Sequence, residues 1–309
     1  MKHIFTVDAA DAGTRLDAWL AKLLPEVSRS RIQKWIKAGE VLVDGKRTTS
    51  HQAIRATETV TVDAVAPAEE PTGIKPRHDI PLDIVYEDDV VVVLNKPSGL
   101  LVHPATTQDT ATLAHALVAH WPQIASVGES PDRPGIMQRL DKDASGLMVV
   151  AKTKKAFDSL KRQFQKHSIS KEYAVLVEGG PTDDEGTIRL HIGRKRNTGR
   201  MAARHKPREG DKEAVTHYYV EERFNRVTLL TIRTETGRTH QIRAHMDAIG
   251  CPVVGDSLYG LKRPARFPLP RLFLHAKSLG FTHPVTRRKL AFTAPLPPEL
   301  DHILQKLRA

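Results

Sequence analysis

Apolar residues near the start of the chain recur with the period of a helix. Between residues 14 and 24, apolar positions fall at i, i+3, i+4 and i+7, namely Leu16, Trp19, Leu20 and Leu23. This spacing places them on one helix face that would be buried against a neighbour. The sequence therefore predicts an amphipathic helix over residues 14–24.

A second helix is predicted directly afterwards, over residues 28–39. Ser28 is a candidate N-cap after a proline, and Gly39 is a candidate C′ residue. If the apolar side chains of this segment face the first helix, its basic side chains stay exposed: Arg29, Arg31, Lys34 and Lys37. A basic face suits contacts with an RNA backbone, which need positive charge but no reading of bases. A solvated face without a ligand is the alternative.

Turn signals and composition divide the chain into parts. Asp44-Gly45 predicts a hairpin between two short strands. Residues 66–80 are rich in proline and charge and lack periodicity, as expected of a linker. We therefore predict a small domain of two helices and a sheet over residues 13–65, and a second domain over residues 81–309.

Strand and helix patterns alternate in the second domain. Short apolar runs over residues 81–100 predict paired strands, and helical spacing recurs at 110–120 and 153–167. Residues 170–179 switch to a period of two, which places Tyr173 on the apolar face of a strand. This alternation predicts a sheet with helices packed against it.

Residues 227–250 predict a strand, a turn and a helix that Gly250 would end. Ile242, Met246 and Ile249 form the expected apolar stripe of this helix. Arg238 falls at the junction of strand and helix. Free backbone N–H groups and positive potential mark a helix N-terminus, so an arginine there can help to hold a phosphate or pair with a carboxylate.

Composition adds a preferred partner. The chain has 309 residues, a formal net charge of +11 and a sequence pI near 9.7. Because the basic residues are spread over several segments, nucleic acid is the leading partner class. A single cysteine, Cys251, excludes an internal disulfide and a multi-thiolate zinc site and agrees with a reducing cytosol. The apolar runs are too short for a bilayer and no signal-peptide pattern opens the chain, so we expect a cytoplasmic monomer without a membrane partner.

The leading candidate for chemistry is Asp141, in a polar loop directly before an apolar strand. It lies between Arg139 and Lys142, and neighbouring positive charge favours the ionised carboxylate, which can act as a nucleophile or a base. Asp and Gly in such a loop more often serve turn geometry. On these residues alone, the turn is the favoured interpretation.

Several sequence blocks resemble one enzyme family. RLDKDASGLMVVAK, at residues 139–152, resembles the signature of the RluA-type pseudouridine synthases, which isomerise uridine in RNA, and most closely that of members acting on large-subunit ribosomal RNA. Gln138 stands where the family usually has His, and Ala144 where Thr is usual. LNKPSGLLVHP, TGRTHQIRAH and LFLHAKSLGFTHPVT resemble further blocks of the family, in the same order along the chain. Residues 13–65 resemble the S4-type RNA-binding domain.

The resemblance implies an α+β fold, with a mixed or antiparallel sheet, a catalytic cleft and flanking helices. It assigns the essential carboxylate to Asp141 and, through the K-x-Y motif, a tyrosine that stacks on the base and takes the C5 proton to Tyr173. A core tyrosine is the alternative for that position. Through the G-R-T-H-Q-I-R block it assigns to Arg238 the arginine that pairs with the aspartate.

The implied function is the isomerisation of specific uridines in 23S-type ribosomal RNA or in a ribosomal precursor particle. The reaction requires no cofactor and no metal, and we expect none. Residues expected to contact RNA or to position the loops around it are Arg139, Arg194, Arg196, Arg200, His240 and Arg243. A non-catalytic S4-domain protein that binds RNA or ribosomes is the alternative. A glycosidase-like enzyme would need a second carboxylate, for which Asp143 is the candidate.

Overall fold

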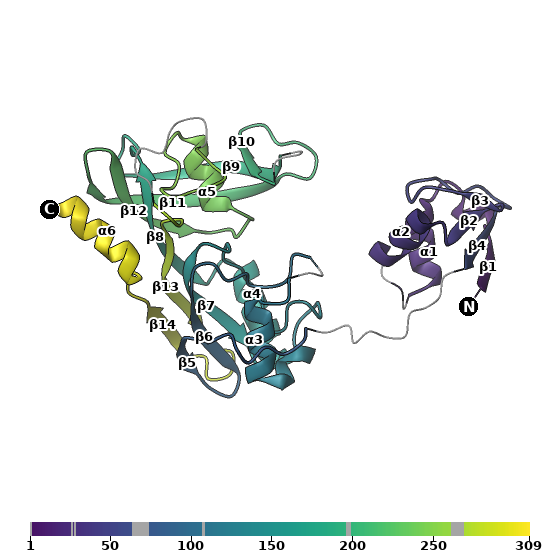
Figure 1. The fold of residues 1–309 in the computed structure, drawn as a ribbon, viewed down its shortest axis with the longest axis horizontal. Coiled ribbons are helices and arrows are strands. Elements are labelled where there is room, and N and C mark those ends of the chain that lie inside the picture. The colour runs from purple at the N-terminus through teal and green to yellow at the C-terminus, as the bar shows by residue number, and fades with distance from the viewer. Residues whose placement is uncertain are drawn as a thin grey trace. The chain divides into compact units, whose positions relative to one another are not determined.

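The computed structural model describes residues 2–25, 27, 29–63, 74–106, 109–195, 199–260 and 269–309 (Figure 1). Contacts divide the chain into two compact units, Met1–Thr72 and Gly73–Ala309. Most of the first half of the predicted linker, together with the predicted N-cap Ser28, lies outside the described residues.

The N-terminal unit packs two helices on a small antiparallel sheet. The helices are α1 (Leu16–Leu23) and α2 (Arg29–Ala38). The strands, in spatial order, are β1 (Lys2–Thr6), β4 (Thr59–Asp63), β2 (Val41–Val43) and β3 (Lys46–Arg47). Asp44 and Gly45 have φ angles of 48° and 74°, as the predicted hairpin turn requires. Strand β1 precedes residue 13, where the predicted domain begins, and extends the sheet by one strand.

In the second unit, the described residues form a ten-stranded sheet with the order β10-β9-β11-β12-β8-β13-β7-β6-β5, and β14 pairs with β13. The strands are β5 (Ile84–Glu87), β6 (Val91–Lys96), β7 (Ser145–Ala151), β8 (Ser170–Glu178), β9 (Glu185–Arg194), β10 (Met201–Arg204), β11 (Lys212–Arg223), β12 (Val227–Thr234), β13 (Leu274–Thr282) and β14 (Lys289–Thr293). Their pairing is antiparallel except between β13 and β7. The predicted α+β class with a mixed sheet is confirmed.

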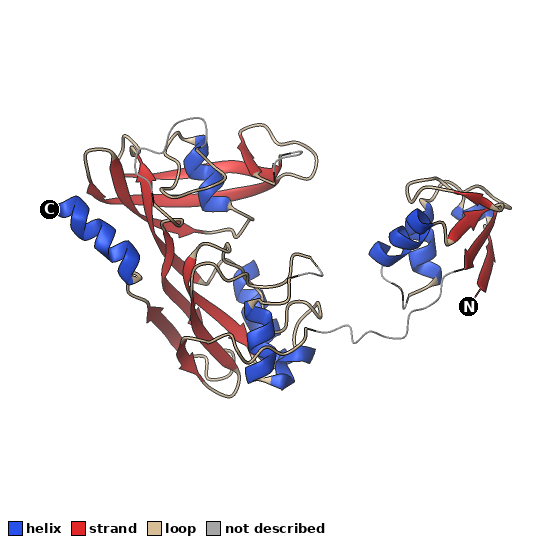
Figure 2. Cartoon of the chain, viewed as in Figure 1, coloured by secondary structure: helices blue, strands red, loops and turns tan. Residues whose placement is uncertain are grey.

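Helices cover separate parts of this sheet (Figure 2). The helices α3 (Leu113–His120) and α4 (Lys154–Gln165) share one apolar core with β6 and β7. Helix α5 (Gln241–Ala248) belongs to a second core with β8, β9 and β12. The C-terminal helix α6 (Pro298–Arg308) packs through Leu300 and Leu304 on a third. None of the helices in the described ranges is long and apolar enough to cross a membrane.

The two halves of the sheet meet where β13 runs parallel to β7 for only two residue pairs. Gly146 sits at this crossing with a φ of 115°, and a Cβ there would lie 2.4 Å from the carbonyl oxygen of Ala276. Only glycine permits this close approach. The crossing directly follows residues 141–144, so the fold places the Asp141 loop between the two halves.

Candidate active site

A cavity of about 590 Å³ surrounds Asp141. Its walls come from the loop before β7, from α4, from β8 and from the segment that joins β12 to α5. Asp141, Tyr173, Arg238, His240 and Arg243 all line it. The structure thus brings these predicted site residues together although about a hundred positions separate the first from the last.

Lys96 joins the loop that carries Asp141 to residues 97–100 through backbone carbonyls of both segments. Lys96, only 1% exposed, donates from Nζ to the carbonyl oxygens of Pro97, Leu100 and Lys142 at 2.7, 2.9 and 3.1 Å. Gly99 N also donates to the Lys142 carbonyl, at 2.8 Å. The turn after Asp141 is therefore fixed by groups that were not predicted to belong to the site.

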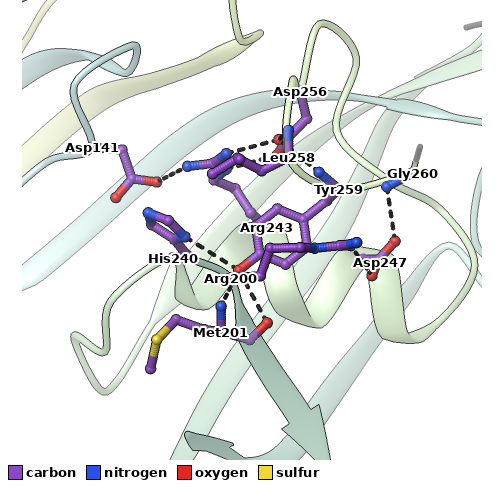
Figure 3. A network of polar contacts seen from close by, with 10 residues as sticks. All are labelled: Asp141, Arg200, Met201, His240, Arg243, Asp247, Asp256, Leu258, Tyr259 and Gly260. Atoms are coloured by element: carbon purple, nitrogen blue, oxygen red, sulfur yellow. Dashed lines mark hydrogen bonds and ion pairs between the residues drawn. The ribbon is translucent and has the colours of Figure 1, made fainter. Parts of the chain in front are cut away.

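Arg243 lies between two carboxylates, as Figure 3 shows. Its Nη1 donates to Oδ2 of Asp141 at 3.0 Å, and its Nε and Nη2 donate to the two oxygens of Asp256 at 2.7 Å each. Burial alone would lower the pKa of Arg243, but the hydrogen bonds and charges of Asp256 and Asp141 raise it above its ordinary value. The guanidinium of Arg243 is therefore always charged. Among the described residues no group donates a hydrogen bond to Oδ1 of Asp141, so this oxygen is open to the cavity.

The prediction that Arg238 pairs with Asp141 is wrong. Arg238 Nε donates to the backbone carbonyl of Glu213 at 3.1 Å, and Arg243 takes the place beside Asp141. The reason is the local path of the chain: His240 adopts a left-handed conformation, with φ at 52°, directly before α5 begins at Gln241. Arg238 therefore lies outside the helix, whereas Arg243 lies in its first turn.

Tyr173 projects from β8 into the same cavity. Burial, with a smaller contribution from the negative charge of Asp141, raises the pKa of its hydroxyl to about 12, against a hydrogen bond with Thr234 that lowers it. The hydroxyl is therefore protonated at neutral pH. Lys171, two residues earlier on the strand, also lines the cavity, and burial lowers its pKa to about 8.

A tyrosine that was not predicted completes the support around Arg243 (Figure 3). The ring of Tyr259 lies 5.1 Å from the guanidinium of Arg243 and 4.6 Å from that of Arg200. Its hydroxyl lies 3.2 Å from Nδ1 of His240 and donates to the carbonyl of Met201 at 3.1 Å. Arg200 also pairs with Asp247 at 3.2 Å. His240 and Arg200, which were predicted to contact RNA, thus belong to the network that orients Arg243.

The two departures from the family signature lie in the wall of the cavity. Nε2 of Gln138 is buried without a hydrogen-bond partner in the described part of the chain. Ala144 is 1% exposed and packs in the apolar core that contains Ile242 and Met246. Burial and the charges of Arg133 and Arg139 lower the pKa of His103 in the same wall to about 4, so its imidazole is neutral.

The remaining predicted RNA contacts are dispersed. On α2, Arg29, Lys34 and Lys37 are exposed and Arg31 is half-buried; Arg29 also pairs with the buried carboxylate of Asp17 at 3.0 Å. Arg139 and Arg194 are exposed near the cavity, whereas Arg196 lies outside the described residues. No cluster of three His, Cys, Asp or Glu residues able to hold a metal occurs in the described ranges.

Sequence reasoning missed Asp256, Tyr259 and Lys96. The first two stand three apart in a segment that follows α5, and Asp256 accepts hydrogen bonds from the backbone N–H groups of Leu258 and Tyr259 at 2.8 and 3.0 Å. This is the pattern of an Asx turn. Asp followed by a serine is typical of such a turn, but nothing local shows that its carboxylate also binds an arginine thirteen positions earlier.

Comparison with known proteins identifies the protein family to which a chain with this site belongs. Residues 90–248 match the RNA pseudouridylate synthase family, and residues 14–60 match the S4 domain. The ribosomal large subunit pseudouridine synthase D of Xanthomonas campestris pv. campestris is 42% identical over 309 residues, covering 96% of this chain and 90% of the relative. The protein of the same name from Neisseria meningitidis serogroup B is 43% identical over 313 residues, covering 98% and 81%.

Solved structures agree. The human RNA pseudouridylate synthase domain containing 1 protein is 29% identical with a TM-score of 0.55, covering 74% of this chain and 95% of that one. The human domain containing 4 protein, at 24% identity and a TM-score of 0.58, covers 73% and 93% and shares the fold. The chain belongs to the RNA pseudouridylate synthase family. It is an RNA pseudouridine synthase, an isomerase, with an N-terminal S4 domain.

Proposed function

We propose that the chain isomerises specific uridines to pseudouridine in large-subunit ribosomal RNA, with Asp141 as its catalytic carboxylate. The observation that carries this proposal is the ion pair between Asp141 and Arg243 inside a cavity that Tyr173 also lines. The side chain of Asp141 is 14% exposed. It is thus held through one oxygen by the guanidinium of Arg243 and is reachable from the cavity.

The chemistry needs such a carboxylate. Pseudouridylation breaks the N1–C1′ bond of uridine, turns the uracil over and joins C5 to C1′. Asp141 would act by attacking C1′ or C6 or by taking a ribose proton, after the nucleotide has been turned out of its stack into the cavity. We propose that the ring of Tyr173 covers the uracil. Because its hydroxyl is protonated at neutral pH, we propose that the proton displaced from C5 passes to water, while N1 gains a proton in place of its bond to C1′.

The substrate class follows from the relatives and from the S4 domain. The relatives from Xanthomonas and Neisseria are named for the ribosomal large subunit, and this chain covers most of their length. In our proposal residues 13–65 bind RNA, 66–80 link the domains and 81–309 carry out the isomerisation. We propose a monomer that meets ribosomal RNA or its precursor particle in the cytoplasm.

The test is Asp141→Asn, assayed by tritium release from C5-labelled uridine in large-subunit ribosomal RNA. We expect loss of turnover with RNA affinity within about twofold of wild type, since one neutralised group in the cavity contributes little to a binding energy that phosphate contacts dominate. Asp143→Asn is the matched control, because Asp143 is an exposed carboxylate two positions away and should leave turnover unchanged. Turnover by Asp141→Asn near the wild-type rate would refute the assignment, and loss in Asp143→Asn would instead favour a pair of acids.

A further inference from the structure

A second cavity, of about 1100 Å³, lies beside the Asp141 cavity. Its walls come from the ends of β9 and β10, from the turn over residues 208–212 and from residues 237–239. Arg139, Gly237 and Arg238 line both cavities. A chain that enters the first cavity can therefore continue into the second past these residues.

The second cavity has an excess of positive charge. Its basic lining residues are Arg139, Arg194, Lys195, Arg204, Arg208, Lys212 and Arg238, and its acidic ones are Glu209 and Asp211. Asp211 is already engaged, because both of its oxygens accept from Nη1 of Arg204, at 2.9 and 2.8 Å. Within the described ranges the side chains of Arg139, Arg194, Arg208 and Lys212 make no hydrogen bond or ion pair, so this charge is available to a polyanion.

The floor of the cavity is ordered in advance of any ligand. The side chains of Arg204 and Asp211 are 16% and 5% exposed, and Oδ2 of Asp211 also accepts from the backbone N–H of Arg208 at 3.0 Å. Gly193 lies so close that a Cβ there would fall 1.6 Å from Oδ1 of Asp211. A buried ion pair therefore fixes the turn that presents Arg208, which reduces the entropy cost of binding.

Arg238 occupies the wall that the cavities share. Its Nε is anchored on the Glu213 carbonyl, while its terminal nitrogens have no partner among the residues that the structure describes. A guanidinium with both terminal nitrogens open matches the two oxygens of a phosphodiester. Arg238, which was predicted to pair with the catalytic carboxylate, is thus better suited to bind a phosphate.

We propose that the second cavity takes the nucleotide joined to the target uridine, and that Arg238 binds the phosphodiester between the two. This inference rests on the proposed function. Among the described residues no aromatic side chain lines the second cavity, so no stacking platform for the base is present. Recognition there is of the phosphate and not of the base, which positions the substrate without reading its sequence.

The test uses a large-subunit ribosomal RNA fragment that the full-length enzyme modifies, with a neutral methylphosphonate on the 5′ or the 3′ side of the target uridine. One of the two substitutions should raise KM about tenfold with little change in kcat, as expected for a lost charge-assisted hydrogen bond. In Arg238→Ala, KM should already be raised, and the same methylphosphonate should add nothing. An abasic neighbour should leave KM unchanged.

Arg208→Ala tests the cavity itself. We expect its salt slope of RNA binding to fall by about 0.7–0.9, the value for one phosphate contact. Lys206→Ala is the matched control, because Lys206 is an exposed cation two positions before Arg208 that does not line the cavity, and it should change the slope by much less.

Three results would overturn the inference: a full methylphosphonate penalty in Arg238→Ala, an abasic penalty larger than the phosphonate penalty, or equal effects of the Arg208 and Lys206 variants. Affinities of the same RNAs are measured beside turnover. If wild-type enzyme formed no pseudouridine in any large-subunit fragment, the proposed function would fail, while these affinities would still decide the subsite.

Discussion

Removing the charge of Asp256 should show how much of the site depends on the anchoring of Arg243. Asp256→Asn keeps the oxygen that accepts from Leu258 and Tyr259, so the turn that it holds should survive. It removes one of two carboxylates from a guanidinium that is 7% exposed. Breaking a buried pair by removing one partner costs about 3–5 kcal/mol.

The rate should fall together with the stability. With Asp256 neutral, the Nε and Nη2 contacts at 2.7 Å lose their charged acceptors, and of the three hydrogen bonds only the one to Asp141 keeps a charged acceptor. Misplacement of a catalytic group by about 1 Å is worth roughly a hundredfold in rate, so we expect kcat to fall by about 10- to 100-fold. Tritium release measures the rate, and hydrogen exchange of amides in α5 and β7 measures stability within the catalytic unit alone.

Asp247→Asn is the control, since it neutralises a carboxylate on α5 that pairs with Arg200 at 3.2 Å but is 35% exposed. This half-buried pair should contribute on the order of 1 kcal/mol, less than the buried pair with Asp256. If Asp256→Asn matched this control in both exchange and rate, the claim that Asp256 anchors the catalytic pair would be refuted.

Two further predictions concern buried groups behind the site. Lys96→Met leaves the carbonyls of Pro97 and Leu100 without the donor that Lys96 supplies, and leaves that of Lys142 with Gly99 N alone. At about 1–3 kcal/mol for each stranded group, it should lower kcat about tenfold without changing RNA affinity; unchanged turnover would count against it. His245 has no partner for either ring nitrogen among the described residues, and burial lowers its pKa to about 4. Below pH 6.5 the unfolded chain gains the proton first, so stability is full above pH 6.5 and falls by about 3 kcal/mol as the pH drops to 4. Urea unfolding at both pH values should show a smaller loss in His245→Met, and an equal loss in both proteins would contradict the reasoning.

Periodicity located most elements but not the orientation of α5. The stripe Ile242, Met246 and Ile249 predicted a helix with one buried face, yet Gln241 to Met246 are all buried and Ile249 is 38% exposed. If the side of α5 opposite this stripe were exposed to solvent, Arg243 would be exposed as well. Because the β10 end and residues 256–259 cover that side, Gln241 and Arg243 of α5 are buried and line the cavity, and only the tertiary structure decides this.

The choice between Arg238 and Arg243 shows the same limit at single-residue scale. Both arginines stand in TGRTHQIRAH. Local sequence signals place Arg238 at a helix N-terminus, where a negatively charged carboxylate is stabilised. What separates them is the left-handed turn at His240, which a histidine adopts here although few residues other than glycine do. Asp141 and Tyr173 could be placed from motifs, since each lies in or beside a buried strand whose register fixes its direction.

Sharing one arginine between two acids explains how the site fixes the position of Asp141 and still leaves it reactive. Asp256, fully buried, takes two of the three guanidinium hydrogen bonds, and Asp141 takes one. A carboxylate held by both oxygens would be stabilised as a ground state and would have no oxygen left to meet the sugar or the base. A planar guanidinium with several donors can bind both oxygens of Asp256 and one oxygen of Asp141 at the same time. A lysine at position 243 could therefore not replace the arginine.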